Sequence, residues 1–328
     1  MQRNSAARAA NLVRNGEPGP PRDLTAAAPP DPATAVGVGE ELDAEARRVY
    51  RAALEALHGA GVDFLIGGAH ALAPHTGIFR DTKDLDVFLR KEDCEYALAV
   101  LDAAGFTGEL TFPHWLAKAY VGDRYIDLIF SAGNGVAVVD DLWFVHAIPG
   151  SVLGIPVWLC PPEEMIWSKA FIMERERYDG ADIAHLIQAC GRDLDWRRLL
   201  ARFGRRWRVL LSHLVLFGFI YPGERACVPD AVMANLMRRL DREREWPGET
   251  GRVCDGTLLS RQQYLVDVST RGYADGRLAP RGEMSAADVA HWTAAISSSS
   301  APAPPTSVAP AVPSNGRRPG SRAHRRRR

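Results

Sequence analysis

The stretch "FLIGGAHALAPHTGIFRDTKDLDVFLRKED", residues 64–93, decides the fold because it joins an apolar run, two glycines and a second apolar run that carries two carboxylates. The first run ends at Gly67 and Gly68, which predict a break after a buried strand and the start of a short helix. Asp84 and Asp86 then stand two residues apart within the next predicted strand. A buried strand avoids unpaired carboxylates because their desolvation is costly, so a cation or hydrogen-bond donors should neutralise this pair.

The two aspartates predict a metal site. Successive side chains of a strand alternate in direction, so Asp84 and Asp86 project from one side of the sheet, about 7 Å apart at roughly 3.3 Å per residue. They repel each other unless cations lie between them, and Mg²⁺ is the hard cation that proteins commonly share with substrate phosphates. A third carboxylate, Asp127, lies in the apolar run "RYIDLIF", residues 124–130. If its strand is a neighbour, the three carboxylates converge on one spot.

The glycine pair predicts a phosphate site beside these carboxylates. Gly67 and Gly68 leave the backbone unobstructed, and the helix that follows would direct free N–H groups and its positive end at a phosphate. A phosphate cradle next to carboxylate-held metal ions indicates phosphoryl or nucleotidyl transfer. Such chemistry needs no histidine, so we interpret the nearby His70, His75 and His114 as structural.

The pattern Gly67-Gly68, Asp84-x-Asp86 and Asp127 resembles the DNA polymerase β-like nucleotidyltransferase superfamily. The form "GGxAL…R-x-T-x-D-L-D" is similar to its bacterial minimal and AbiE-toxin-like branches, and the resemblance covers about residues 60–190. It implies an α/β (α+β) fold with a small mixed sheet flanked by helices. It also implies transfer of NMP from an NTP such as ATP to a hydroxyl or amino acceptor, with Mg²⁺ or Mn²⁺ bound and pyrophosphate released. The implied catalytic and metal-binding residues are Asp84, Asp86 and Asp127, and the implied nucleotide-binding residues are Gly67, Gly68, Thr82 and Lys169.

A helix in those branches resembles "PPEEMIWSKAFIMERERYDGADIAHLIQA", residues 161–189, with a Lys and then an Arg before Asp-x-x-Asp. In this interpretation Lys169 is a point charge on the triphosphate, whereas the alternative is a lysine that faces water. Arg175, Arg177 and Asp179 have the spacing of an exposed i,i+4 ladder, which we favour for Arg177. Likewise, the alternative for Asp127 is a strand-edge carboxylate paired with Arg124.

The remaining patterns predict a helix within residues 40–61, a strand at 84–89, a helix at 92–105, a hairpin about Gly122-Asp123 and a further strand or hairpin at 151–159. Helices should follow Pro162, with a break near Tyr221. This gives a disordered segment 1–39, a nucleotidyltransferase core 40–160, a mainly helical region 161–290 and a disordered Pro/Ser-rich and Arg-rich tail 291–328. The segment from Cys254 is conspicuous: Ser260 should cap a helix that starts at Arg261, or the segment binds the acceptor or acts as a lid.

Charge separates the possible acceptors. The chain has zero formal net charge, but the seven arginines from Arg317 onward and the slightly basic first 39 residues leave about −8 for residues 40–316. This acidic core suits a small hydroxylated or amino acceptor such as a cationic aminoglycoside. An AbiE-like toxin acting on tRNA or protein, or a non-catalytic nucleotide-binding protein, remains an alternative. Nucleic acid is expected only as acceptor or as a ligand of the Arg-rich tail, because the core lacks a basic footprint.

The composition also bears on location. Five cysteines without CxxC spacing predict neither a zinc site nor a disulfide framework, which fits a reducing cytoplasm. The most apolar run, "VLLSHLVLFGFIY" at residues 209–221, is short and interrupted by Ser212 and His213. It predicts a buried helix rather than a membrane span.

Overall fold

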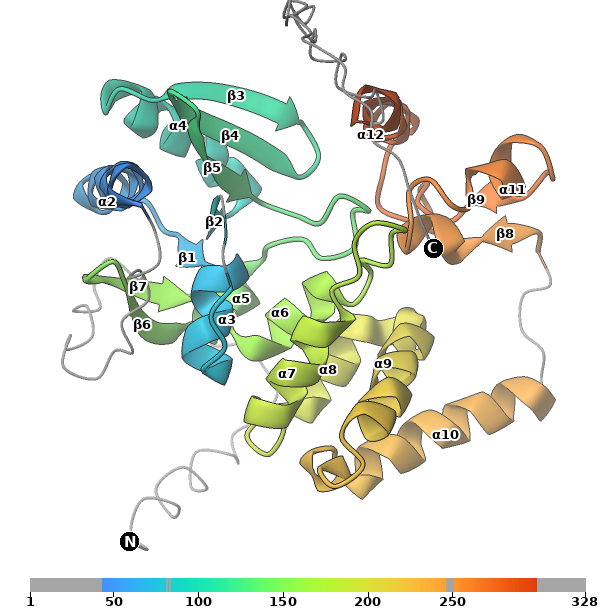
Figure 1. Cartoon of the computed structure of the whole chain (residues 1–328). Helices are drawn as coiled ribbons and strands as arrows, with labels where there is room; N and C mark the ends of the chain where they lie inside the picture. The colour runs from blue at the N-terminus through green and yellow to red at the C-terminus, as the bar shows by residue number, and fades with distance from the viewer. Residues whose placement is uncertain (1–42, 81, 83, 246–250, 300–328) are drawn as a thin grey trace, which may run out of the picture.

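The computed structural model describes residues 43–80, 82, 84–245 and 251–299, and Figure 1 shows how they are arranged. The predicted disordered segment 1–39 lies outside the described residues, as does the Arg-rich run from Arg317. None of the helices within the described ranges is both long and apolar enough to cross a membrane.

A seven-stranded sheet organises the first half of the described chain, with the strand order β3-β4-β5-β2-β1-β7-β6. β2 is parallel to β5 and β1 is parallel to β7, whereas the other neighbouring strands are antiparallel. The predicted α/β fold with a mixed sheet flanked by helices is therefore confirmed. The strands are β1 (Leu65–Ile66), β2 (Leu85–Phe88), β3 (Thr107–Phe112), β4 (Leu116–Val121), β5 (Arg124–Ile129), β6 (Ile148–Val152) and β7 (Ile155–Leu159).

The predicted hairpins are present. β4 and β5 turn at Gly122, whose φ of +56° is a left-handed conformation that glycine adopts without strain. β6 and β7 form the second hairpin. The sequence did not predict β3, because it is an edge strand whose first four residues are exposed and lack the alternation of a half-buried strand.

Helices cover the sheet and fix its apolar side. α2 (Ala44–Gly59) begins where the Asp43 carboxylate accepts a hydrogen bond from the Ala46 backbone, and α4 (Cys94–Ala103) packs beside it. Leu85 and Val87 of β2 and Ile126 of β5 are fully buried. Because strand side chains alternate, the residues between them project from the other side of the sheet. That other side carries the three aspartates.

The chain after β7 is helical, as predicted, but the expected helix over residues 161–189 is two helices. α6 (Pro162–Lys169) ends before residues 170–179, which form a loop with a bridge between Met173 and Tyr178, and α7 (Gly180–Cys190) follows. The loop forms because buried ion pairs of Lys169 and Asp179, described below, hold its two ends. The other helices are α3 (Gly68–Thr76), α5 (Asp141–Val145), α8 (Trp196–Phe203), α9 (Trp207–Ile220) and α10 (Asp230–Glu245).

The prediction that residues 209–221 form a buried helix is only half right. α9 buries Leu210, Leu214 and Phe217, but Val215 and Phe219 on its other face are exposed. The run is apolar all round in sequence, and only one stripe of it contacts neighbouring helices.

Residues 251–299, the C-terminal segment, form a small unit of their own beside the sheet and the helices (Figure 1). It contains a two-stranded parallel sheet of β8 (Val253–Cys254) and β9 (Ala274–Asp275), followed in the chain by α12 (Ala286–Ser299), with α11 (Leu265–Ser269) between the strands. α12 crosses position 291, where the sequence pattern placed the start of the disordered tail. The Ser and Ala residues there are helix-compatible, and Trp292 packs on aromatic side chains of the β3–β4 turn. Short 3₁₀ turns are Lys91–Asp93, Gly204–Arg206, Arg225–Cys227 and Asp255–Leu258.

Candidate active site

The glycine pair lies against the strand that carries the aspartates. The Gly67 backbone N–H donates to the Asp86 carbonyl at 3.0 Å, and α3 begins at Gly68. A Cβ at Gly67 would lie 2.2 Å from the Phe88 ring, and one at Gly68 would lie 1.7 Å from the Asp86 carboxylate. Gly68 also has a φ of +54°. Any side chain at either position would therefore push β2 away from the start of α3.

The three aspartates converge as the sequence predicted. Asp86 of β2 and Asp127 of β5 are direct partners in the parallel register, and Asp84 immediately precedes β2. One carboxylate oxygen from each lies within 4.8 Å of those from the other two. Within the described residues this is the one group of three or more His, Cys, Asp or Glu side chains with such spacing. The set is all carboxylate, which suits a hard cation such as Mg²⁺ or Mn²⁺.

Thr82 and Lys118 hold the outer two carboxylates. The Thr82 hydroxyl donates a hydrogen bond to Asp84 Oδ1 at 2.6 Å, so Thr82 orients the carboxylate of a candidate metal ligand. Lys118 Nζ donates to Asp127 Oδ1 at 2.5 Å and lies 4.0 Å from the centre of the Tyr125 ring. The alternative pairing of Asp127 with Arg124 is not observed, because Arg124 pairs with Asp43.

The sequence analysis missed Lys118, although the signal was present. A hairpin that turns at Gly122-Asp123 pairs the position four before Gly122 with the position four after Asp123, and the observed register does place Lys118 opposite Asp127. Directly opposed residues share one face of a sheet, so a lysine there reaches the carboxylate.

The protonation of the site reflects its crowding. Burial raises the pKa of Asp86 to about 7, and the like charges of Asp84 and Asp127 add to this effect. Burial also raises the pKa of Asp127, although Lys118 opposes the shift. One half-buried lysine, Lys118, in direct contact with a group of three carboxylates leaves that group under-neutralised. A divalent cation would remove the repulsion, so the residues fit a metal site.

A second ionic cluster lies at the end of α6 and the start of α7. Lys169 Nζ contacts Asp179 at 2.7 Å and Asp182 at 2.9 Å. Burial opposes the charge of Lys169, but the two carboxylates outweigh it and raise the pKa of that ammonium group. Lys169 therefore does not face water, and its charge is already shared with two aspartates. Arg80 closes the cluster through Asp182 at 2.7 Å.

The helical i,i+4 spacing predicted for Arg177 is wrong, because residues 170–179 are not helical, but its side chain is exposed as predicted. Arg177 instead donates from Nε and from its terminal nitrogen to the two oxygens of Asp179, at 3.0 and 3.1 Å. Arg175 is exposed, and its nearest acidic partner is Glu176 at 3.9 Å. The site thus gains a cationic side chain, Arg177, that the sequence pattern assigned to the solvent-facing surface.

None of the three histidines near the site belongs to the group of three carboxylates. His75 bonds the Cys160 carbonyl and His114 bonds the Gly133 carbonyl, each through Nε2. His70 is buried in α3. Burial lowers the pKa of all three imidazoles, which keeps them neutral at neutral pH.

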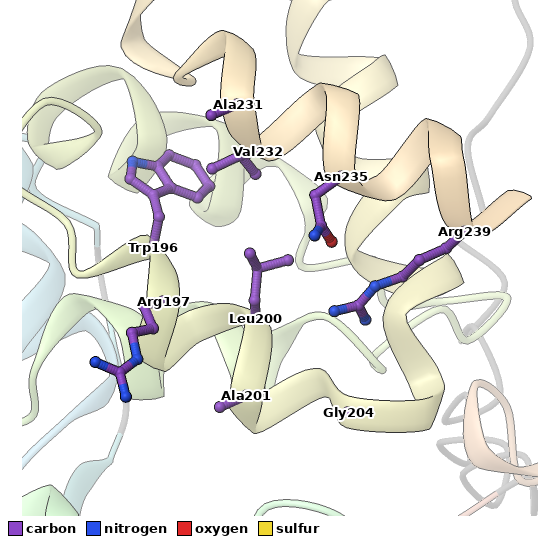
Figure 2. A pocket seen from close by; sticks show the side chains of 9 residues that line it. All are labelled: Trp196, Arg197, Leu200, Ala201, Gly204, Ala231, Val232, Asn235 and Arg239. Atoms are coloured by element: carbon purple, nitrogen blue, oxygen red, sulfur yellow. The ribbon is translucent and has the colours of Figure 1, made fainter. Parts of the chain in front are cut away.

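A cavity of about 550 Å³ lies elsewhere, between α8 and α10 (Figure 2). Leu200 and Val232 face it from the two helices, with Asn235 and Arg239 along one side. None of the three aspartates or the two glycines lines it, so it is separate from the carboxylate site.

No family model matches the chain, and no curated protein matches it. Among solved structures, the chain is similar to the antibiotic-resistance factor ANT(2'')-Ia. The solution structure has 20% sequence identity and a TM-score of 0.37 over 52% of this chain and 98% of that chain. The crystal structure with adenylyl-2''-tobramycin has 18% identity and a TM-score of 0.33 over 53% and 98%. An antigenic nucleotidyltransferase-like protein from Paracoccidioides brasiliensis has 15% identity and a TM-score of 0.30 over 52% and 93%.

Proposed function

We propose that the protein is a metal-dependent nucleotidyltransferase that moves NMP from an NTP to an acceptor and releases pyrophosphate. The observation that carries the proposal is the convergence of Asp84, Asp86 and Asp127 beside the glycine-led start of α3. A cluster of three carboxylates with one lysine is costly to a fold unless it binds a cation. A helix start beside it offers backbone N–H groups to phosphate.

Each residue has a definite task in this scheme. Asp84, Asp86 and Asp127 would hold the metal, which would supply positive charge to the phosphates and acidity to the acceptor hydroxyl. Gly67 and Gly68 admit the triphosphate to the backbone amides at the start of α3. Thr82 orients Asp84 through its 2.6 Å hydrogen bond.

The transfer itself is an in-line displacement. The acceptor oxygen attacks the α-phosphorus, the bond from that phosphorus to the bridging oxygen of the β-phosphate breaks, and pyrophosphate leaves. Asp127 would accept the proton of the acceptor hydroxyl through the carboxylate oxygen that Lys118 does not hold. The chain thus supplies positioning, charge and one proton acceptor.

The acceptor class follows from charge. Residues 40–316 carry a net charge of about −8, which attracts cationic acceptors and repels polyanions. A small polyamine-like acceptor with hydroxyl or amino groups, such as an aminoglycoside, is therefore the proposed substrate. The carboxylate site does not require this choice, so the test offers other acceptors too.

The test incubates purified protein with each α-labelled NTP and Mg²⁺ or Mn²⁺, and offers aminoglycoside, tRNA and protein acceptors in parallel. The wild type should label the aminoglycoside, and Asp84→Asn should lower the rate by about 10³-fold while the protein stays folded. Label on tRNA or protein would identify the AbiE-like alternative. Metal-independent NTP binding without transfer to any acceptor would contradict the enzyme and favour a non-catalytic nucleotide-binding protein.

A further inference from the structure

The C-terminal segment is a pre-formed unit, because a buried ion pair closes it. Arg277 is 1% exposed and makes a bidentate contact with Asp275, the shorter hydrogen bond being 2.6 Å. Asp275 also accepts hydrogen bonds from the Thr257 hydroxyl at 2.8 Å and from the Arg277 backbone at 3.0 Å. A charge pair with this many bonds rigidifies the turn around β8 and β9. The C-terminal segment is therefore a rigid unit, and it can fix the position of the residues that it contacts.

The C-terminal segment forms hydrogen bonds with Glu174, in the loop between α6 and α7. The Ser260 hydroxyl donates to Glu174 Oε2 at 2.5 Å, and the Arg261 backbone N–H donates to Glu174 Oε1 at 3.0 Å. Beside them, the Met173 backbone N–H donates to the Leu259 carbonyl at 3.0 Å. Ser260 is 1% exposed, so this bond is shielded from water. We call these three hydrogen bonds the latch.

The latch connects directly to the cationic side chain of the loop. The Glu174 backbone N–H donates to the Arg177 carbonyl at 2.8 Å, so the residue that binds the C-terminal segment also fixes the backbone of Arg177. The Arg177 side chain is 66% exposed and is oriented by Asp179. Asp179 raises the pKa of Arg177 most, burial opposes this, and Asp86 and Asp84 raise it further. Arg177 is therefore near enough to Asp84 and Asp86 for their charges to act on it, and its exposed side chain is available to the phosphates of a nucleotide in the proposed site.

We infer that Glu174 is a positioning residue of the nucleotide site: through Ser260 and Arg261 it fastens the loop that carries Arg177. The inference rests on the proposed function, and it gives residues 257–261 a role that their sequence left open. Ser260 does accept a hydrogen bond from the Gln263 backbone at 3.1 Å, as a cap would, but α11 begins only at Leu265. Its bond to Glu174 is the contact that reaches the site.

The test compares Glu174→Ala with Glu176→Ala, a matched control two residues along the same loop. Glu176 is 75% exposed and forms an ion pair with Arg175 at 3.9 Å. Glu174→Ala should raise the KM for the NTP about tenfold and leave kcat at saturating NTP within about threefold, because Arg177 contributes to phosphate binding. Glu174→Gln, which still accepts from the Arg261 backbone, should restore most of the affinity. Glu176→Ala should behave as the wild type.

A second readout does not depend on turnover. Hydrogen exchange at the Met173 and Arg261 amides should accelerate about tenfold in Glu174→Ala and in Ser260→Ala, because the latch is broken in both. If the wild type shows no Mg²⁺-dependent NTP binding, the proposed function fails and this inference with it. If the wild type binds NTP and Glu174→Ala binds it equally well, this inference alone is overturned.

Discussion

Two of the carboxylate groups within the described part of the chain, each of three side chains, differ in how they are neutralised. Asp140, Glu163 and Glu164 share two arginines: Arg198 contacts both glutamates, and Arg202 bonds Glu164 and makes a bidentate contact with Asp140. The active-site group of Asp84, Asp86 and Asp127 has Lys118 alone as a direct ion-pair partner among the described residues.

The difference separates a group that is paired with arginines from the group that is proposed to bind a metal. The arginine-paired group joins α6, α8 and the start of α5, and two arginines serve its three carboxylates. The active-site group has one lysine for three carboxylates. Burial raises the pKa of Glu164 in the first group and of Asp86 in the second to about 7, but Arg198 and Arg202 oppose the shift of Glu164, whereas the like charges of Asp84 and Asp127 add to that of Asp86. A protein retains such a cluster when an external cation completes it. The predictions below test whether the two groups respond to mutation in these different ways.

The largest effect on stability should come from the arginine-paired group. Arg202 is 9% exposed, so Arg202→Met would leave Glu164, which is fully buried, with an incomplete set of partners. We expect a loss of about 3–5 kcal/mol in the free energy of unfolding. Denaturant unfolding at pH 7 measures it. The control is Arg208→Met, which removes an exposed pair with Glu243 and should change the free energy by less than about 1 kcal/mol. Equal losses in the two variants would contradict the distinction.

In the active-site group, removal of a charge should have the opposite effect and raise the free energy of unfolding. The pKa of Asp86 rises from its ordinary 3.8 to about 7, so the folded protein binds a proton that the unfolded chain releases between these values. Its contribution to stability is therefore largest below pH 4 and is lost as the pH rises to about 7. An asparagine at position 86 does not ionise, so the Asp86→Asn variant avoids this decrease in stability at high pH. In the absence of divalent metal, the variant should be more stable than the wild type at pH 8 by about 1–3 kcal/mol.

Unfolding curves in EDTA at pH 5, 6, 7 and 8 measure this trend. Asp179→Asn provides a comparison of opposite sign, because Arg177 and Lys169 overcome burial and hold the pKa of Asp179 below its ordinary value. That variant should be less stable than the wild type at every one of these pH values. A stability difference for Asp86→Asn that does not grow between pH 5 and pH 8 would mean that the carboxylates do not repel one another.

The sequence was sufficient where local patterns set the structure. Asp84 and Asp86 are related by strand alternation, Asp127 sits in a recognisable apolar strand, and the hairpin about Gly122 sets the register that brings Lys118 to it. None of these placements needs a contact between distant parts of the chain except the pairing of β2 with β5. The glycine pair could likewise be located from its position between an apolar strand and a helix.

The sequence was insufficient where distant segments meet. Helical spacing predicted one helix through residues 161–189, but the buried contacts of Lys169 with Asp179 and Asp182 favour a loop there. The bond between Glu174 and Ser260 joins residues 86 positions apart, and no local pattern of either one predicts it. The exposure of Arg177 was predicted correctly, but its pairing with Asp179 within a loop was not, because tertiary contacts override helical spacing there.

The smallest expected effect concerns Lys118, the single cation within the active-site group. Lys118 neutralises part of the carboxylate charge that would attract the external cation. Lys118→Met should therefore tighten Mn²⁺ binding a few-fold, which corresponds to about 1 kcal/mol. Titration calorimetry with Mn²⁺ alone measures this, and Lys91→Met, which removes an exposed lysine, should leave the affinity unchanged. Weaker Mn²⁺ binding by Lys118→Met would instead mean that the 2.5 Å hydrogen bond holds Asp127 in the geometry of a ligand. In that case Lys118 supports the metal site. The active-site group would then resemble the arginine-paired group, in that a cationic side chain of the fold holds its carboxylates in place.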